Sequence, residues 1–109
     1  MRYSELTERQ LVASYTDGNH KAFEELLNRV QSKVFGKIQM VVRDYELAQD
    51  LFQDTICKAI QALNDGQYNE EGKFGAWMMR IAHNLCIDHF RNAKKMQFKG
   101  GVNTTLSRN

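Results

Sequence analysis

The sequence predicts an all-α domain, and three observations carry this prediction. The chain contains no proline, the residue that most strongly interrupts a helix. Apolar residues recur at spacings of three and four over long stretches, as on helices that bury one side, and no stretch has the alternation of a strand. With 109 residues, 42% hydrophobic and 26% charged, the chain has the size and composition of one globular domain. We therefore expect a compact bundle of three long helices and a short N-terminal one.

The first helix is short. Its pattern covers residues 4–15, where Ser4 or Thr7 is a suitable N-cap because a side-chain oxygen there accepts from a free backbone N–H. The residues expected to face inward are Leu11, Val12 and Tyr15.

The second helix follows a break at residues 17–19, in which Asn19 is a good N-cap. It is expected from His20 to about Val42. Gly36 inside it destabilises a helix by about 1 kcal/mol relative to alanine, so we expect close packing against a neighbouring helix there. Its apolar positions are Phe23, Leu26, Leu27, Val30, Val34, Ile38 and Val41.

After a turn at Arg43 and Asp44, the third helix is predicted over residues 45–63, with two contrasting sides. The side expected to be buried carries Leu47, Leu51, Thr55, Ile56, Ala59, Ile60 and Leu63. The side expected to be exposed carries Glu46, Gln49, Asp50, Gln53, Asp54 and Lys58.

A polar loop with two glycines, residues 64–73, precedes the last helix, predicted over residues 74–95. Beyond Met96 the sequence is rich in Gly, Ser, Thr and Asn, which is typical of a tail or linker. We therefore expect a domain over residues 1–96 and a tail or the start of an interdomain linker over 97–109. The apolar stripe of the last helix is Phe74, Trp77, Met78, Ile81, Leu85 and Cys86, and its second stripe is Arg80, Asn84, Ile87 and Arg91, followed by Lys94 and Lys95.

Charge is unevenly distributed along the chain. The formal net charge is +2, but residues 44–72 carry one lysine against seven carboxylates, and residues 73–109 carry seven cations against Asp88 alone. An acidic middle and a basic end indicate two surfaces with different partners.

The sequence indicates a cytoplasmic protein. Its N-terminal residues are charged where a signal peptide would be apolar, and no apolar run is long enough to insert into a membrane. Cys57 and Cys86 are isolated from each other. Small buried hydrophobic residues in a reducing compartment explain them better than a disulfide does.

Three stretches follow the motifs of one family. Residues 18–26, GNHKAFEEL, resemble the pattern G-[DN]-x-x-A-F-x-x-L. Residues 48–56, AQDLFQDTI, resemble A-x-D-L-x-Q-[ED]-[TV]-[FI]. Residues 74–91 resemble F-x-x-W-L-x-R-I-A-x-N-x-x-x-D-x-x-R. Together they resemble conserved region 2 of bacterial RNA polymerase sigma factors of the extracytoplasmic-function (ECF) group, over about residues 5–96.

The resemblance implies the sigma factor region 2 fold and a role in transcription initiation. It implies that the acidic third helix docks on core RNA polymerase, at the clamp-helix coiled coil of the largest subunit. An exposed acidic side fits a basic partner surface; a merely solvated face is the alternative that composition alone would favour. The residues matching the docking role are Asp50, Leu51, Phe52, Gln53 and Asp54.

The resemblance also implies that the last helix and its preceding loop recognise the promoter minus-ten element, on its non-template strand. Cations neutralise phosphates, a carboxamide reads a base edge, and an aromatic ring stacks on an unpaired base. The matching residues are Lys58, Tyr68, Asn69, Arg80, Asn84, Arg91, Lys94 and Lys95. Trp77 lies on the apolar stripe, and periodicity favours a buried core position over a DNA contact.

Other functions have less support. His83, Cys86 and His89 lie three apart, but a zinc site needs more converging ligands than this pattern supplies, so we expect no metal or other cofactor. No catalytic arrangement of residues is visible, so we expect no enzymatic activity.

One alternative stays open: a helical protein-interaction module, for example one that binds an anti-sigma factor, without promoter reading of its own. Members of the group also carry a second, helix-turn-helix domain. No such pattern follows Met96, so we expect an isolated domain or a truncated piece.

Overall fold

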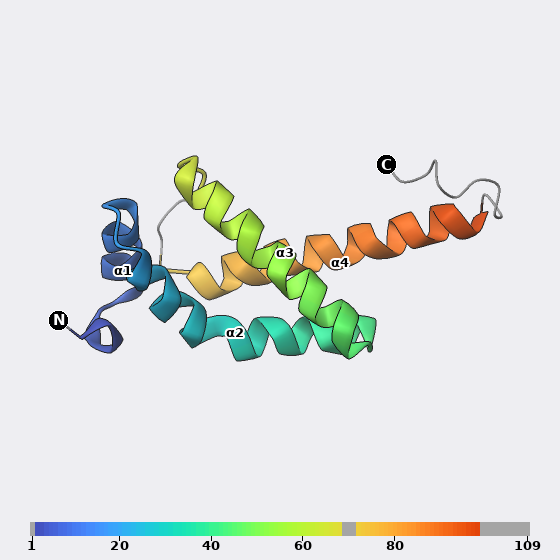
Figure 1. The fold of residues 1–109 in the computed structure, drawn as a ribbon, viewed down its shortest axis with the longest axis horizontal. Coiled ribbons are helices and arrows are strands. Elements are labelled where there is room, and N and C mark those ends of the chain that lie inside the picture. Colours follow the sequence, from blue (N-terminus) through green and yellow to red (C-terminus); the bar gives the residue numbers. More distant parts are fainter. Residues whose placement is uncertain (1, 69–71, 99–109) are drawn as a thin grey trace.

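The protein is a bundle of helices centred on its second helix, His20–Val42 (Figure 1). The computed structural model describes residues 2–68 and 72–98, with residues 94–98 described by their backbone only. The described residues form no strand, which confirms the all-α prediction. The second helix packs against the other three, and the third also packs against the fourth. The elements are a 3-10 turn η1 (Tyr3–Glu5), α1 (Glu8–Thr16), α2 (His20–Val42), α3 (Tyr45–Asn64) and α4 (Phe74–Phe98).

Helix α1 begins later than predicted because of a capping box. Thr7 Oγ1 accepts from the backbone N–H of Gln10 at 3.1 Å, and Gln10 Oε1 accepts from the backbone N–H of Thr7 at 2.8 Å. This reciprocal pair satisfies two N–H groups that a helix start leaves free. The predicted start at residue 4 is therefore wrong, whereas Thr7 as N-cap is confirmed.

The boundaries of α2 and α3 agree with prediction to within one residue because local caps define them. Asn19 Oδ1 accepts from Lys21 N at 3.2 Å at the start of α2. Asp44 Oδ1 accepts from Leu47 N at 3.1 Å at the start of α3. Between the two helices Arg43 adopts a left-handed conformation, with φ of 54°, which lets the chain reverse direction within two residues. At the other end of the chain, α4 continues to Phe98, past the predicted end at residue 95.

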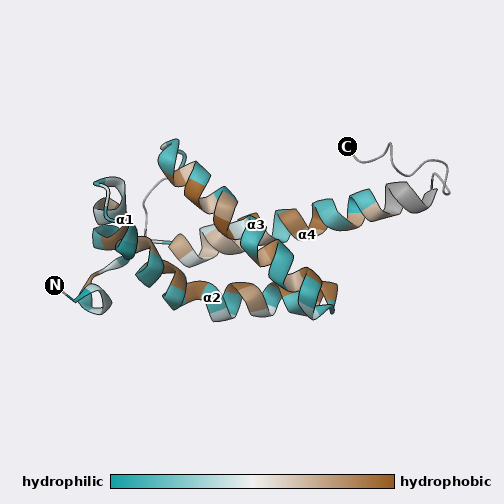
Figure 2. Cartoon of the chain, in the orientation of Figure 1, coloured by the Kyte–Doolittle hydropathy of each residue, from teal (hydrophilic) through white to brown (hydrophobic). Residues whose placement is uncertain are grey.

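The core follows the predicted apolar stripes, and Figure 2 shows the apolar residues recurring along each helix. The one buried polar side chain among the described residues is Thr55. Its hydroxyl donates to the carbonyl of Leu51 at 2.8 Å, so burial leaves it satisfied. The largest fully buried side chains are Phe74, Leu11, Leu26, Ile38, Met78, Val34, Thr55 and Cys86.

The prediction of close packing at Gly36 is wrong. Gly36 is exposed, and a Cβ atom added to it would meet nothing within 4 Å. Gly75, at the start of α4, is the glycine that approaches a neighbouring helix, because an added Cβ would lie 3.4 Å from Cγ1 of Val30. In this part of α2 the apolar stripe is turned away from Gly36.

The two cysteines differ in environment. Cys86 is 1% exposed, as predicted, but Cys57 is exposed, so the prediction of a buried Cys57 is wrong. Burial raises the pKa of the Cys86 thiol, and the nearby Lys37 partly opposes that shift. The raised pKa of the thiol and its burial away from solvent both lower the reactivity of Cys86.

We expect Ellman's reagent to modify one thiol per chain under native conditions, and both in denaturant. Cys57→Ser should abolish the native reaction, whereas Cys86→Ser should leave it unchanged. Rapid native modification of the Cys57→Ser variant would contradict the burial of Cys86.

The raised pKa of Cys86 also predicts how the stability of the fold depends on pH. As the pH rises, the thiol ionises in the unfolded chain before it ionises in the folded one. The contribution of the neutral, buried thiol to the free energy of unfolding should therefore be lost as the pH rises above the ordinary thiol pKa.

No helix within residues 2–68 and 72–98 combines the length and apolar character that crossing a bilayer requires.

Candidate nucleic-acid and protein interfaces

A shallow hollow of about 430 Å³ lies between the C-terminal end of α3 and the first turns of α4. We call it the α3/α4 groove. Its wall on α4 is apolar, whereas α3 and the residues just after it supply a cation, a carboxylate and two carboxamides. A flat apolar wall next to mixed hydrogen-bonding groups suits a nucleic-acid base. The lining residues are Lys58, Gln61, Ala62, Asp65, Gln67, Trp77 and Ile81.

Three aromatic rings support the α4 side of the groove. Tyr68 lies 4.5 Å from Trp77 and 5.9 Å from Phe74 between ring centroids, and Phe74 lies 5.6 Å from Trp77. Phe74 is fully buried. Trp77 is half-buried, packing against the core while it also lines the groove, so the predicted core position describes only part of its surroundings.

Of the residues assigned to DNA before α4, the structure places two beside this groove. Lys58 is exposed and lines it. Tyr68 is half-buried against Trp77, so its ring supports the groove wall and is not displayed alone in solvent. Asn69 lies outside the described residues. The sequence prediction missed Gln61, Asp65 and Gln67, which lack an apolar period or a motif that would mark them.

The predicted polar stripe of α4 lies on the surface. Arg80, Asn84 and Arg91 are exposed, and Ile87 is 39% exposed. Arg91 forms an exposed ion pair with Asp88, one turn before it, at 3.5 Å. Exposed pairs of this kind contribute little to stability, so Arg91 can exchange its partner for a phosphate. Lys94 and Lys95 lie on the helical backbone of α4, and their side chains are outside the described residues.

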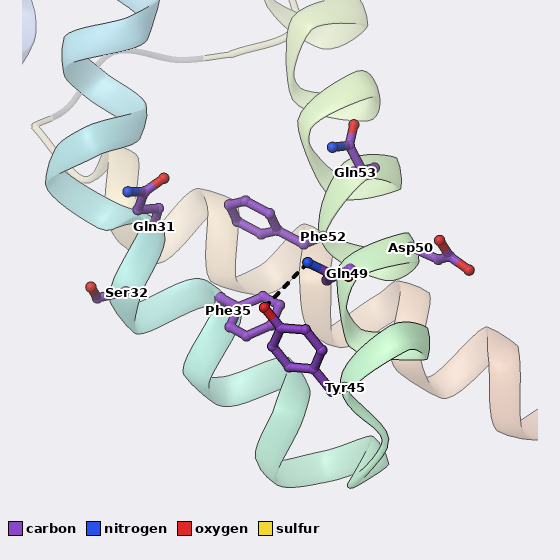
Figure 3. A pocket seen from close by; sticks show the side chains of 8 residues that line it. All are labelled: Gln31, Ser32, Phe35, Tyr45, Gln49, Asp50, Phe52 and Gln53. Carbon is purple, nitrogen blue, oxygen red and sulfur yellow. Dashed lines mark hydrogen bonds between the residues drawn. The ribbon is translucent and has the colours of Figure 1, made fainter.

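A second hollow, of about 570 Å³, lies between α2 and the start of α3 (Figure 3). We call it the α2/α3 groove. Three aromatic rings form its floor: Phe35 on α2 contacts Tyr45 at 5.7 Å and Phe52 at 5.8 Å, both edge to face. Tyr45 is 57% exposed although it is aromatic. The lining residues are Gln31, Ser32, Phe35, Tyr45, Gln49, Asp50, Phe52 and Gln53.

The rim of the α2/α3 groove is polar. Gln49 Nε2 donates to the hydroxyl of Tyr45 at 3.3 Å, the contact dashed in Figure 3. Asp50 and Gln53 are exposed at the rim, and the carboxylate of Asp50 points away from the rings. Aromatic anchors surrounded by polar groups are typical of protein-binding sites.

The residues assigned to docking separate into three environments. Asp50, Gln53 and Asp54 are exposed, as predicted, and Phe52 is half-buried in the groove floor. Leu51 is 6% exposed and belongs to the core, so the structure does not place it on the docking surface. The sequence prediction missed the contribution of α2. Its signal was Phe35, a large apolar residue off the buried stripe of that helix.

Within the part of the chain that the structure describes, no three His, Cys, Asp or Glu side chains are grouped so as to hold a metal ion. His83 is exposed, whereas Cys86 points into the core.

Comparison with known proteins gives one consistent result. Residues 23–96 match the family model described as Sigma-70 region 2. The chain is 35% identical over 82 residues to RNA polymerase sigma-H factor of Pseudomonas aeruginosa, covering 75% of this chain and 42% of that protein. It is 35% identical over 80 residues to RNA polymerase sigma factor CarQ of Myxococcus xanthus, covering 73% and 45%. It is 32% identical over 86 residues to ECF RNA polymerase sigma factor BldN of Streptomyces coelicolor, covering 78% and 32%.

The chain thus spans less than half the length of each of these three relatives. No solved structure matches it.

Proposed function

Because the chain belongs to the sigma-70 region 2 family, as a region 2 domain of the ECF group, we propose that it acts in transcription initiation by linking core RNA polymerase to promoter DNA. The observation that carries this proposal is the presence of two chemically different grooves at opposite ends of α3. One has an aromatic floor and a polar rim that carries Asp50, and the other adjoins the polar stripe of α4. A single helix therefore connects a protein-type surface to a nucleic-acid-type surface.

In this proposal the α2/α3 groove binds the clamp-helix coiled coil of the largest polymerase subunit. The exposed carboxylates Asp50 and Asp54 attract a basic partner and set its register. The rings of Tyr45, Phe35 and Phe52 supply the apolar contact area that holds it. The aromatic floor gives the docking surface a shape that an exposed helix face alone would lack.

The α3/α4 groove and the polar stripe of α4 bind the non-template strand of the minus-ten element. Arg80 and Arg91 neutralise backbone phosphates, and the carboxamide of Asn84 reads a base edge. An unpaired base enters the groove between Lys58 and Trp77. Asn69, Lys94 and Lys95 extend this assignment on the strength of the family motif. Strand opening then follows from preferential binding of the single-stranded state, which offsets the free energy needed to unpair the flipped base.

The promoter assignment is tested by binding to labelled single-stranded DNA. This DNA carries the minus-ten sequence of a promoter that was selected for binding to this domain. Arg80→Ala and Asn84→Ala should each weaken binding by about 1–3 kcal/mol, as measured by fluorescence anisotropy. Arg80→Ala should also reduce the slope of log affinity against log salt by about one, because one phosphate contact is lost.

Two exposed residues of α2 provide matched controls, Lys33→Ala for the cation and Asn28→Ala for the carboxamide. Both variants should bind the DNA like the unmodified chain. Equal affinity of all four variants would refute promoter reading by α4. If the chain docks on core RNA polymerase but does not bind this DNA, the result would favour the alternative, a protein-interaction module. In both cases an anti-sigma factor is a further expected partner.

A further inference from the structure

Helix α1 is hydrogen-bonded to both sides of the α3/α4 groove. The hydroxyl of Tyr15 donates to Oδ1 of Asn64, the last residue of α3, at 3.2 Å. Oε1 of Glu8 accepts from the backbone N–H of Phe74, the first residue of α4, at 3.2 Å. These partners lie 49 and 66 residues apart in the sequence. A helix that lines no part of the groove therefore contacts both helices that form it.

The contact of Glu8 acts as a helix cap supplied from a distant element. The first N–H groups of a helix have no partner within it, and a carboxylate at this end also interacts favourably with the helix dipole. In α4 the hydrogen bond from Trp77 N to Lys73 O, at 3.0 Å, closes the first turn. Glu8 satisfies the N–H of Phe74 inside that turn, so it caps the start of α4.

Aromatic packing reinforces the two hydrogen bonds. The ring of Tyr15 lies 5.6 Å from Phe23, and Phe23 lies 6.3 Å from Phe74. Phe74 in turn contacts Trp77 at 5.6 Å. A continuous path of rings therefore runs from α1 to the apolar wall of the groove (Figure 1 shows α1 beside the start of α4).

Helix α1 is itself anchored to α2. Nη2 of Arg29 donates to the carbonyls of Tyr3, Ser4 and Leu6 at 3.2, 3.2 and 2.7 Å. Its Nε donates to Glu25 at 2.9 Å. Three carbonyls held by one guanidinium attach the segment before α1 to the central helix of the bundle.

We propose that Glu8 and Tyr15 are positioning residues, which hold the end of α3 and the start of α4 at the spacing that the groove needs to accept a base. Asp65 directly follows Asn64, and Trp77 lies in the turn that Glu8 caps, so both groove walls depend on these two contacts. The DNA-binding part of this inference rests on the proposed function; the geometric part does not.

Trp77 provides a direct readout because it is the single tryptophan of the chain and lines the groove. In the full chain without DNA, Tyr15→Phe and Glu8→Ala should shift the Trp77 emission to the red and increase its quenching by acrylamide. Tyr3→Phe is the matched control, since it removes the hydroxyl that accepts from Asn19 at 2.7 Å, away from the groove. It should leave both signals unchanged. Glu8→Gln keeps an accepting oxygen and should restore the unmodified emission.

Affinity for short single-stranded dA, dC and dT homopolymers is measured in the same samples. Tyr15→Phe and Glu8→Ala should bind about three- to tenfold more weakly than Tyr3→Phe, as expected for the loss of one hydrogen bond. Thermal unfolding of all variants shows how much stability each one loses. Because Tyr3→Phe also loses one side-chain hydrogen bond, a general loss of stability would weaken its DNA binding as well.

Trp77 signals of Tyr15→Phe and Glu8→Ala that match those of Tyr3→Phe would overturn the positioning role. If Glu8→Ala fails to fold, Tyr15→Phe, which keeps the aromatic packing, and Glu8→Gln still decide the question. Absence of any homopolymer binding by the unmodified chain, with the Trp77 shifts present, would count against the proposed function at this groove and leave the positioning role supported.

Discussion

Phe74→Ala is expected to lower the free energy of unfolding by about 3–5 kcal/mol, the usual range for removing a buried phenylalanine ring. Phe74 is fully buried and contacts the rings of Phe23, Tyr68 and Trp77. Its removal leaves a cavity where α2, α4 and the segment before α4 meet. Since a domain of this size has a total stability of about 5–15 kcal/mol, the variant should unfold at a much lower urea concentration, followed by far-UV circular dichroism.

Phe90→Ala on the same helix is the matched control. Phe90 is 43% exposed, and substitutions at exposed positions usually change stability by no more than about 0.5 kcal/mol. A loss of less than about 1 kcal/mol for Phe74→Ala would show that the ring cluster can collapse around the missing side chain.

Asp50→Arg is expected to weaken docking on the polymerase clamp-helix fragment by roughly 10- to 100-fold, because it replaces an attraction with a repulsion at the rim of the α2/α3 groove. Biolayer interferometry with the immobilised coiled coil measures this effect. Most of the loss should appear in the association rate, and the affinity of the unmodified chain should fall as salt rises.

Two further variants separate the electrostatic and apolar parts of the docking surface. Tyr45→Ala should weaken docking through the dissociation rate by about tenfold, as at an aromatic anchor, with little loss of stability because Tyr45 is 57% exposed. Leu51→Ala should instead lower stability, because Leu51 belongs to the core.

Glu24→Arg reverses an exposed carboxylate of α2 that does not line the α2/α3 groove and serves as the control for total charge. If it weakens docking as much as Asp50→Arg does, the effect is one of net charge, and the assignment of this groove to the polymerase fails.

Local features explain why most of the fold was predictable. Asn19 and Asp44 mark helix starts by side-chain chemistry that acts over two or three residues. The apolar period identified the core stripes, and on α4 it identified the exposed cations as well. The errors occurred where the same local pattern fits two outcomes. Gly36 and Gly75 both lie within a helix, but of these two only Gly75 lies against a neighbouring helix. The prediction of a buried Cys57 rested on residue type, although Cys57 lies off the predicted apolar stripe of α3, whereas the buried Cys86 lies on the stripe of α4.

The candidate sites were predictable only in part, for a related reason. A helical period shows which side chains share one face, so the exposed Asp50, Gln53 and Asp54 were identified together, as were Arg80 and Asn84. A groove, however, combines residues from two helices. Phe35 joins Tyr45 and Phe52 only because α2 and α3 pack side by side at that end. Glu8 reaches Phe74 only because α1 lies beside the start of α4.

The sequence by itself determined the helices, their buried sides, the acidic and basic segments and the family motifs, since each depends on residues within a few turns of one another. The tertiary structure decided the two grooves, the mixed environment of Trp77 and the contacts of α1 with both walls of the α3/α4 groove. The physical reason is that helix periodicity and capping are short-range, whereas the relative placement of helices follows from the packing of the whole core.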